Sequence, residues 1–159
     1  MKEFLEAYRL TIEEATLWLR EMSDEESLVP RTAGKWSPRE IIGHLIDSAA
    51  NNHQRFVRAQ FVDHLSFDGY DQEDWVRVEN YANESWPLLI DLWRAYNLHL
   101  LHVMAATPPE QLTRMRTHHT LHRIAWQTVP ENEPVTLEYF MRDYVGHLEH
   151  HLAQILRKI

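Results

Sequence analysis

The chain has 159 residues, of which 44% are hydrophobic and 25% are charged, a balance typical of a globular protein. The formal net charge is −8, and lysine and arginine form no cluster, which argues against a nucleic-acid partner. There is no cysteine, which excludes a disulfide framework, a thiolate metal ligand and a cysteine nucleophile. Any bound metal must therefore have nitrogen or oxygen ligands, and any reacting thiol must come from outside the chain.

The N-terminal segment does not have the pattern of a signal peptide, because acidic residues interrupt its apolar stretch. No run approaches the roughly 18–20 apolar residues of a membrane span. We therefore expect a cytoplasmic protein with no membrane partner. Glycine occurs only four times, which favours a helical chain.

Apolar residues recur three and four positions apart in four stretches, which predicts four long amphipathic helices. The expected helices cover residues 2–22, 38–62, 85–106 and 136–158. Their connections are medium to long, and one short extra helix is expected to end near Leu112. The pattern predicts an all-α four-helix bundle that forms a single domain over residues 1–159.

Capping residues mark several of the expected helix starts. Ser37, Pro38 and Glu40 together predict a capping box with proline in the first turn. Thr107 predicts the cap of the short extra helix, and Thr136 that of the last long helix. Each start is a local signal that does not depend on the rest of the fold.

Two irregular connections are expected. The first, residues 63–84, is aromatic and acidic, and we expect it to contain at most a short helix and to cover one end of the bundle. The second, residues 113–134, contains His118, His119 and His122, which form a possible metal-binding cluster. No carboxylate lies within that cluster to support a metal, so it ranks below the histidines of the last helix.

The last helix carries His147 and His151, four residues apart. This spacing puts both imidazoles on one helix face, with Cβ atoms about 5–6 Å apart, so that the two rings can share one metal ion. His150 is turned about 80° from that pair and is expected to point elsewhere. A catalytic site needs about three protein ligands and an open position, and His44 is the best candidate for the third.

A row of polar side chains follows His44 along the second helix. At helical spacing these residues share one side: His44, Asp47, Ser48, Asn51 and Arg55. Asp47 could orient a metal ligand or act as a base, or it could simply form an ion pair with Arg55. Asn51 and Arg55 are candidates for binding a substrate carboxylate or thiol group.

Three motifs occur in a fixed order along the chain. They are Gly34-Lys35-Trp36-Ser37-Pro38-Arg39-Glu40, Gly43-His44-Leu45-Ile46-Asp47-Ser48 and Gly146-His147-Leu148-Glu149-His150-His151-Leu152-Ala153-Gln154-Ile155. Together they resemble the DinB-like superfamily, and most closely its YfiT-like branch of metal-dependent hydrolases. The resemblance spans nearly the whole chain, and its specificity comes from the order and spacing of the three motifs.

The resemblance implies a four-helix bundle in which His44, His147 and His151 bind one divalent metal ion, with nickel and zinc the metals associated with the family. It also implies a homodimer, and six tryptophans, Trp18 among them, could leave apolar surface for a partner. Some relatives join a low-molecular-weight thiol to an electrophile, and others are regarded as hydrolases.

Three neutral imidazoles would leave the metal its full charge and open positions, so that a bound water would be acidified or a bound thiol ionised. The expected function is therefore that of a hydrolase or thiol S-transferase acting on a small-molecule substrate. The alternative is a non-catalytic metal-binding dimeric helical bundle, in which the metal only ties the second helix to the last.

Overall fold

The computed structural model describes residues 1–156, in which four long helices account for more than half of the chain. They are α1 (Lys2–Glu21), α3 (Pro38–Arg58), α5 (Trp86–Ala106) and α8 (Leu137–Ile155). The short helices are α2 (Asp24–Ser27), α4 (Gln72–Glu79), η1 (Tyr81–Asn83), α6 (Pro109–Thr113) and α7 (Leu121–Ile124). The described residues form isolated β-bridges but no sheet, so the predicted all-α four-helix bundle is confirmed. Residues 157–159, the first two of which belong to the predicted helix 136–158, lie outside the described part.

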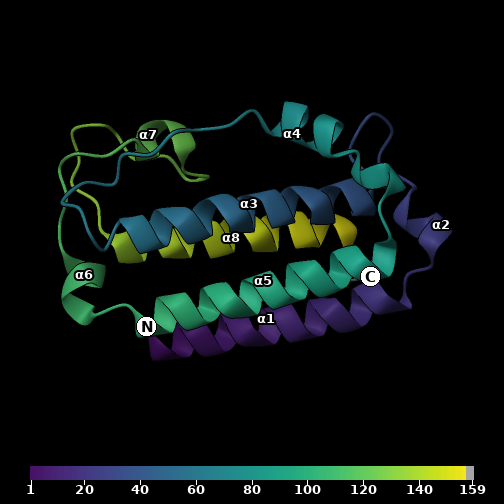
Figure 1. Cartoon of the computed structure of the whole chain (residues 1–159), viewed down its shortest axis with the longest axis horizontal. Helices are drawn as coiled ribbons and strands as arrows, with labels where there is room; N and C mark the ends of the chain where they lie inside the picture. Colours follow the sequence, from purple (N-terminus) through teal and green to yellow (C-terminus); the bar gives the residue numbers. More distant parts are fainter. Residues whose placement is uncertain (157–159) are drawn as a thin grey trace.

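In the bundle, α1 lies beside α5, α5 beside α3, and α3 beside α8 (Figure 1). Figure 1 also shows that α1 and α8 run in one direction and that α3 and α5 run in the other. Because the neighbours α3 and α5 are parallel, the chain between them must return along the length of the bundle. Residues 59–85 make that return and carry α4 across the outer side of α3. The expectation that this connection covers one end of the bundle is therefore wrong.

Most of the predicted helix starts are confirmed. Ser37 and Glu40 form the capping box of α3, and the Thr136 hydroxyl caps α8 by accepting from the backbone N–H of Tyr139. The predicted cap of α6 is wrong. Thr107 ends α5 instead, because its hydroxyl donates to the carbonyl of Val103 and no side chain caps α6. Two short helices were not predicted: α2, which lies between the first two long helices, and α7, which lies within the connection 113–134 that was expected to be irregular.

A buried asparagine links three of the long helices. The Oδ1 atom of Asn97 on α5 accepts hydrogen bonds from Tyr8 of α1 at 2.7 Å and from Tyr144 of α8 at 2.6 Å. Its Nδ2 atom donates to the carbonyl of Trp93. All of these side chains are buried, where a polar group without a partner is costly. The Asn97 amide gives both tyrosine hydroxyls a hydrogen-bond acceptor.

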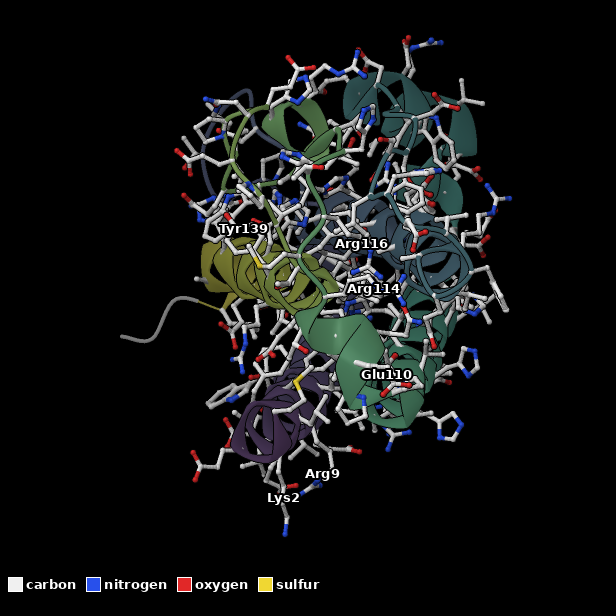
Figure 2. All side chains as sticks on the ribbon, turned by 90° about the vertical axis from the view of Figure 1, so that its left-hand side faces the viewer. Lys2, Arg9, Glu110, Arg114, Arg116 and Tyr139 are labelled. Carbon is white, nitrogen blue, oxygen red and sulfur yellow. The ribbon has the colours of Figure 1, made fainter. Side chains whose placement is uncertain are left out.

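Arg116 closes one end of the bundle and points inward, whereas Lys2 and Arg9 of α1 point outward (Figure 2). The buried guanidinium of Arg116 donates to the carbonyls of Ala59, Gln111 and Arg114, so that one side chain ties the end of α3 to the backbone of residues 111–114. None of the described helices is both long and apolar enough to cross a membrane.

Candidate metal centre

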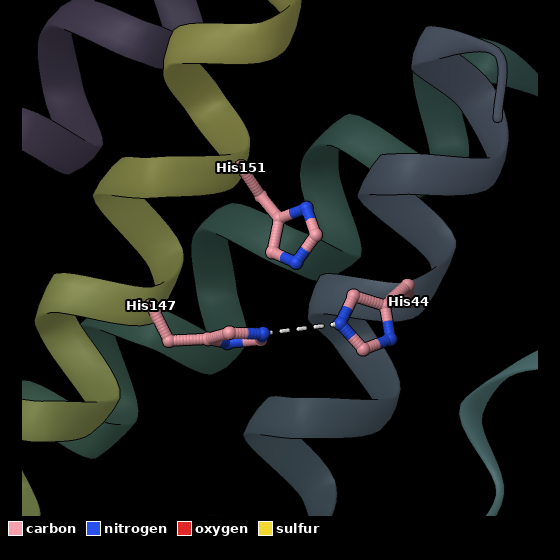
Figure 3. Close-up of side chains that lie close together, drawn as sticks. All are labelled: His44, His147 and His151. Carbon is pink, nitrogen blue, oxygen red and sulfur yellow. Dashed lines mark hydrogen bonds between the residues drawn. The ribbon is translucent and has the colours of Figure 1, made fainter. Parts of the chain in front are cut away.

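α3 and α8 run antiparallel side by side, and they bring together three histidines that are far apart in the sequence (Figure 3). The Nε2 atoms of His44 and His147 lie 3.3 Å apart. Each of His44, His147 and His151 offers one ring nitrogen, and these nitrogens all lie within 4.8 Å of one another. Figure 3 shows the three rings turned toward a common point between the two helices.

The surroundings keep these imidazoles neutral at physiological pH. Burial lowers the pKa of His44 to about 3, and the neighbouring His151 adds to the shift. Burial and the other histidines lower the pKa of His147 to about 3 as well. The pKa of His151 is lowered mainly by burial, although its hydrogen bond with Gln154 opposes the shift. A neutral imidazole keeps a free lone pair, which is the form that binds a metal.

The donor set fits a divalent transition metal. It consists of imidazole nitrogens alone, which suit zinc, nickel or iron better than magnesium or calcium. The Nδ1 atom of His44 is buried and has no hydrogen-bond partner among the described residues, whereas its Nε2 atom faces that of His147. Among the described residues no fourth histidine or carboxylate joins the cluster, which leaves room for solvent or substrate.

Trp36 forms a wall beside the cluster. Its ring centre lies 5.0 Å from that of His44 and 6.4 Å from that of His151. The indole Nε1–H donates to Glu73 of α4, which fixes the ring from its outer edge. The tryptophan excludes water from one side of the histidines and so contributes to their low pKa.

The structure also places the other predicted histidines. His150 is exposed on α8, and its ring lies 5.5 Å from that of Trp126, outside the cluster. In the loop cluster His119 uses both ring nitrogens in hydrogen bonds, one to the carbonyl of Glu133 and one from the backbone N–H of Leu121. Among the described residues, His118, His119 and His122 therefore do not form a second group of converging ring nitrogens.

A cavity of about 370 Å³ opens beside His44 and His147. Four of its lining residues come from one side of α3: His44, Ser48, Asn52 and Arg55. Of the polar row predicted on this helix, Ser48 and Arg55 thus reach the cavity, whereas Asp47 and Asn51 do not line it. Asn51 donates to the carbonyl of Asp47 and lines a neighbouring cavity, and Asn52 takes its place.

Asp47 faces a different neighbour. Its Oδ1 atom accepts a hydrogen bond of 2.6 Å from Tyr81, and its buried Oδ2 atom has no partner in the described part of the chain. Burial raises the pKa of Asp47 to about 6, against the opposing effect of the Tyr81 hydroxyl. The ring of Tyr81 lies so close to Gly43 that a Cβ atom there would collide with it. Glycine in the Gly43-His44 motif thus permits the contact that holds Tyr81 on Asp47.

Arg55 is buried and lines both the histidine cavity and its neighbour. Its guanidinium donates to the carbonyl of Asp68 at 2.6 Å and to the Oδ1 atom of Asn52 at 3.4 Å. The described residues show no ion pair between Arg55 and Asp47 or any other carboxylate. A buried positive charge beside a cavity, held only by neutral acceptors, can bind an anionic group.

Sequence reasoning missed the loop that completes the cavity. Trp126 lines it, and the Asp143 carboxylate of α8 accepts the backbone N–H groups of Trp126 at 2.9 Å and Gln127 at 2.6 Å. The Trp126 ring contacts α8 at Gly146, the lone glycine of that helix. That glycine was the one available signal, because a glycine inside a helix often marks the close approach of another segment.

The chain is similar to known proteins over most of its length. The profile of the DinB superfamily matches residues 7–155. A relative from Oceanobacillus iheyensis, named as a candidate metal-dependent hydrolase, is 23% identical over 152 residues, 87% of this chain and 81% of its own. One from Bacillus cereus with the same description is 24% identical over 149 residues, 91% of this chain and 78% of its own.

A solved structure shows the same fold. YfiT from Bacillus subtilis, described as a probable metal-dependent hydrolase with an unusual four-helix bundle topology, matches with a TM-score of 0.74 at 23% identity. The match covers 98% of this chain and 85% of that one. The profile match extends over nearly the whole bundle, including the segments that carry the three histidines, and this chain belongs to the DinB superfamily.

Proposed function

We propose that this protein is a metal-dependent enzyme in which His44, His147 and His151 hold one divalent metal ion per chain, nickel or zinc. The observation that carries the proposal is the convergence of the three imidazoles, two of which, those of His44 and His147, line a cavity. A structural metal site, which only holds helices together, usually has a fourth protein ligand that closes the coordination shell. The described residues offer no fourth ligand to this cluster. This favours catalysis over the alternative of a non-catalytic metal-binding bundle.

The bound cation would lower the pKa of a water molecule or thiol, which makes a nucleophile available at neutral pH. The residues of the chain bind and orient the substrate. Arg55 would bind an anionic group of a small-molecule substrate, with Asn52 and Ser48 along the same wall. Trp36 and Trp126 would keep water away from the reacting groups.

Asp47 is proposed as the residue that holds a proton near the site. A carboxyl group with a pKa of about 6 is part protonated near neutral pH, which suits proton transfer. Asp47 lies about one helical turn from His44, and the Oδ2 atom of Asp47 and the Nδ1 atom of His44 are both buried without a partner among the described residues, so we assign the carboxyl a role in orienting that imidazole. The side chain of Asn51 donates to the backbone carbonyl of Asp47. Asn51 would therefore contact a substrate only in the neighbouring cavity, which it lines.

Hydrolysis is the first candidate reaction, because it needs one organic substrate and water, and because the relatives are described as hydrolases. Transfer of a low-molecular-weight thiol to an electrophile is the second. In support of the second, a further cavity of about 480 Å³ reaches the cluster from the side of His151, and Gln72 lines both cavities. Two openings on one cluster suit a reaction with two organic substrates.

Metal content tests the proposed site. The protein is stripped with a chelator, reloaded with Zn²⁺ or Ni²⁺, and analysed by mass spectrometry. We expect the His150→Ala variant to keep the tightly bound equivalent and the His151→Ala variant to lose it. If His150→Ala loses the metal and His151→Ala keeps it, the assignment of ligands on α8 is wrong.

Turnover tests the reaction. The metal-loaded protein is assayed against simple esters and amides and, separately, against a thiol paired with an alkylating electrophile. The proposal requires turnover in one arm that disappears in His151→Ala and survives in His150→Ala. Retained metal without turnover in either arm would support the non-catalytic alternative.

A homodimer is proposed as the assembly. Leu17 is 66% exposed and its neighbour Trp18 is 62% exposed on the outer side of α1, an apolar pair that a second copy would cover. Light scattering at micromolar concentration should give twice the mass of the chain, and Trp18→Lys should halve it. A wild-type monomer at that concentration would contradict the proposal.

A further inference from the structure

A second pair of histidines meets on another face of the bundle. His53 projects from α3 and His99 from α5, and their Nε2 atoms lie 3.3 Å apart. The ring centres are 4.8 Å apart and the ring planes cross at 80°. We propose that His53 and His99 form a second binding site for a divalent transition-metal ion, separate from the three-histidine cluster.

The spacing of the two nitrogens suits a shared ion. Two nitrogens that each bind zinc at about 2.0–2.1 Å in tetrahedral geometry lie about 3.3–3.4 Å apart. The same 3.3 Å separates the Nε2 atoms of His44 and His147. A direct hydrogen bond between the rings would ordinarily be shorter, at about 2.9–3.0 Å. The pair is therefore spaced as two ligands of one metal.

The backbone fixes this pair independently of the first site. His53 lies nine residues beyond His44, which is two and a half turns, or about 14 Å along α3. The two histidines therefore face opposite sides of the same helix, one toward α8 and the other toward α5. Because α3 and α5 pack side by side, both Cα atoms are held on rigid elements.

The environment favours the metal-binding form of the His53 imidazole. His53 is half-buried beside the ring of Tyr96, and burial lowers its pKa, with a further contribution from His99. His99 is exposed, so solvent reaches the point between the two rings. Imidazole nitrogens select zinc, nickel, cobalt or copper over magnesium and calcium, which prefer oxygen ligands.

With two protein ligands, the site should bind more weakly than the three-histidine cluster and exchange its ion more readily. His102 lies one turn beyond His99 on α5, and the two ring centres are 6.4 Å apart. Its ring stacks beside His99 instead of facing His53, so it is not needed as a ligand. An ion bound by His53 and His99 would cross-link α3 to α5 from outside the core.

Zinc titration of the full chain tests the proposal. The double variant His147→Ala/His151→Ala, which lacks two residues of the first cluster, is titrated with Zn²⁺ by calorimetry. We expect it to retain one equivalent, and a further His53→Gln or His99→Ala change to abolish that equivalent. This result does not depend on metal binding or activity at the first site.

Matched variants exclude general surface binding. In the same double variant, His102→Ala and the exposed loop change His64→Ala should each leave the equivalent in place. Loss in His102→Ala together with retention in His53→Gln would overturn the assignment of the pair. Zero equivalents in the double variant would overturn the proposal, provided that circular dichroism shows it to be folded. Should the double variant not fold, His99→Ala alone must lower the zinc stoichiometry of the wild type by one.

Discussion

The indole ring of Trp126 occupies the space that a side chain at position 146 would fill. A Cβ atom built on Gly146 would stand 2.9 Å from the Cζ3 atom of Trp126. Since Asp143 holds the backbone of Trp126 through one hydrogen bond and that of Gln127 through another, the loop cannot simply move away. The close contact of loop and helix thus depends on the absence of one side chain.

Gly146→Ala should therefore push Trp126 from α8. We expect a loss of about 1–3 kcal/mol in the free energy of unfolding, in spite of the better helix propensity of alanine. Urea denaturation followed by tryptophan fluorescence measures the change. Gly69→Ala is the control, because a Cβ atom there meets only Ile124 at 3.5 Å, an ordinary contact. Equal stability of the Gly146→Ala and wild-type proteins would show that the loop adjusts freely.

The metal-free protein should lose stability as the pH falls. His44 and His147 have pKa values of about 3 in the folded protein and about 6.5 in the unfolded chain, so between these values the unfolded chain binds more protons. The contribution of these two neutral histidines to the free energy of unfolding is complete above about pH 6.5 and is lost as the pH drops toward 3. Each histidine adds a slope of roughly 1.4 kcal/mol per pH unit in that window.

Urea denaturation between pH 4.5 and 7.5 in the presence of a chelator measures that slope. The His147→Gln variant has no titrating group at that position and should show a shallower pH dependence than the wild type. Parallel curves for the wild type and His147→Gln would contradict the prediction.

Tyr81→Phe should destabilise the protein more at pH 8 than at pH 5. Burial raises the pKa of Asp47 to about 6, above its unfolded value of about 3.8, so its ionisation costs stability as the pH rises through 6. The Tyr81 hydroxyl relieves part of that cost. Its loss should remove about 1–3 kcal/mol at pH 8, and Asp47→Asn in the same background should recover much of it. A loss that is equal at both pH values would exclude this role for Tyr81.

Asn97→Leu should cost about 2–5 kcal/mol, because it leaves the hydroxyls of Tyr8 and Tyr144 buried without an acceptor. Adding Tyr8→Phe and Tyr144→Phe should return a large part of the loss, since no polar group is then stranded. Thermal unfolding of the single and triple variants makes the comparison. If the triple variant is less stable than Asn97→Leu, the packing of the tyrosines matters more than their hydroxyl groups.

The features that the sequence predicts well are those set by neighbouring residues. The start of α3 follows from Ser37 and Glu40, which are three positions apart and satisfy each other's backbone groups. The facing of His147 and His151 follows from the helical repeat alone. His44 was already the best candidate for the third ligand, and the family resemblance selected the same residue. The packing of α3 on α8 places it opposite that pair.

The side of α3 that lines the cavity could not be predicted. Asp47 and Ser48 lie on either side of His44, at about −60° and +40° around the helix, and both angles are compatible with one polar row. The choice depends on segments distant in the sequence: Tyr81 packs on the side of Asp47, whereas the loop of Trp126 leaves the side of Ser48 open. Nothing local to α3 encodes either neighbour.

His44 and His147 are separated by 103 positions in the sequence. The other two histidines of the cluster, His147 and His151, both belong to α8, the last long helix. During synthesis, a ribosome must therefore add more than a hundred residues after the first histidine before the other two exist. A nascent or proteolysed chain that ends before α8 displays a single imidazole from this cluster. The convergence of the three nitrogens thus reports that translation has reached the end of the bundle and that its last helix has docked.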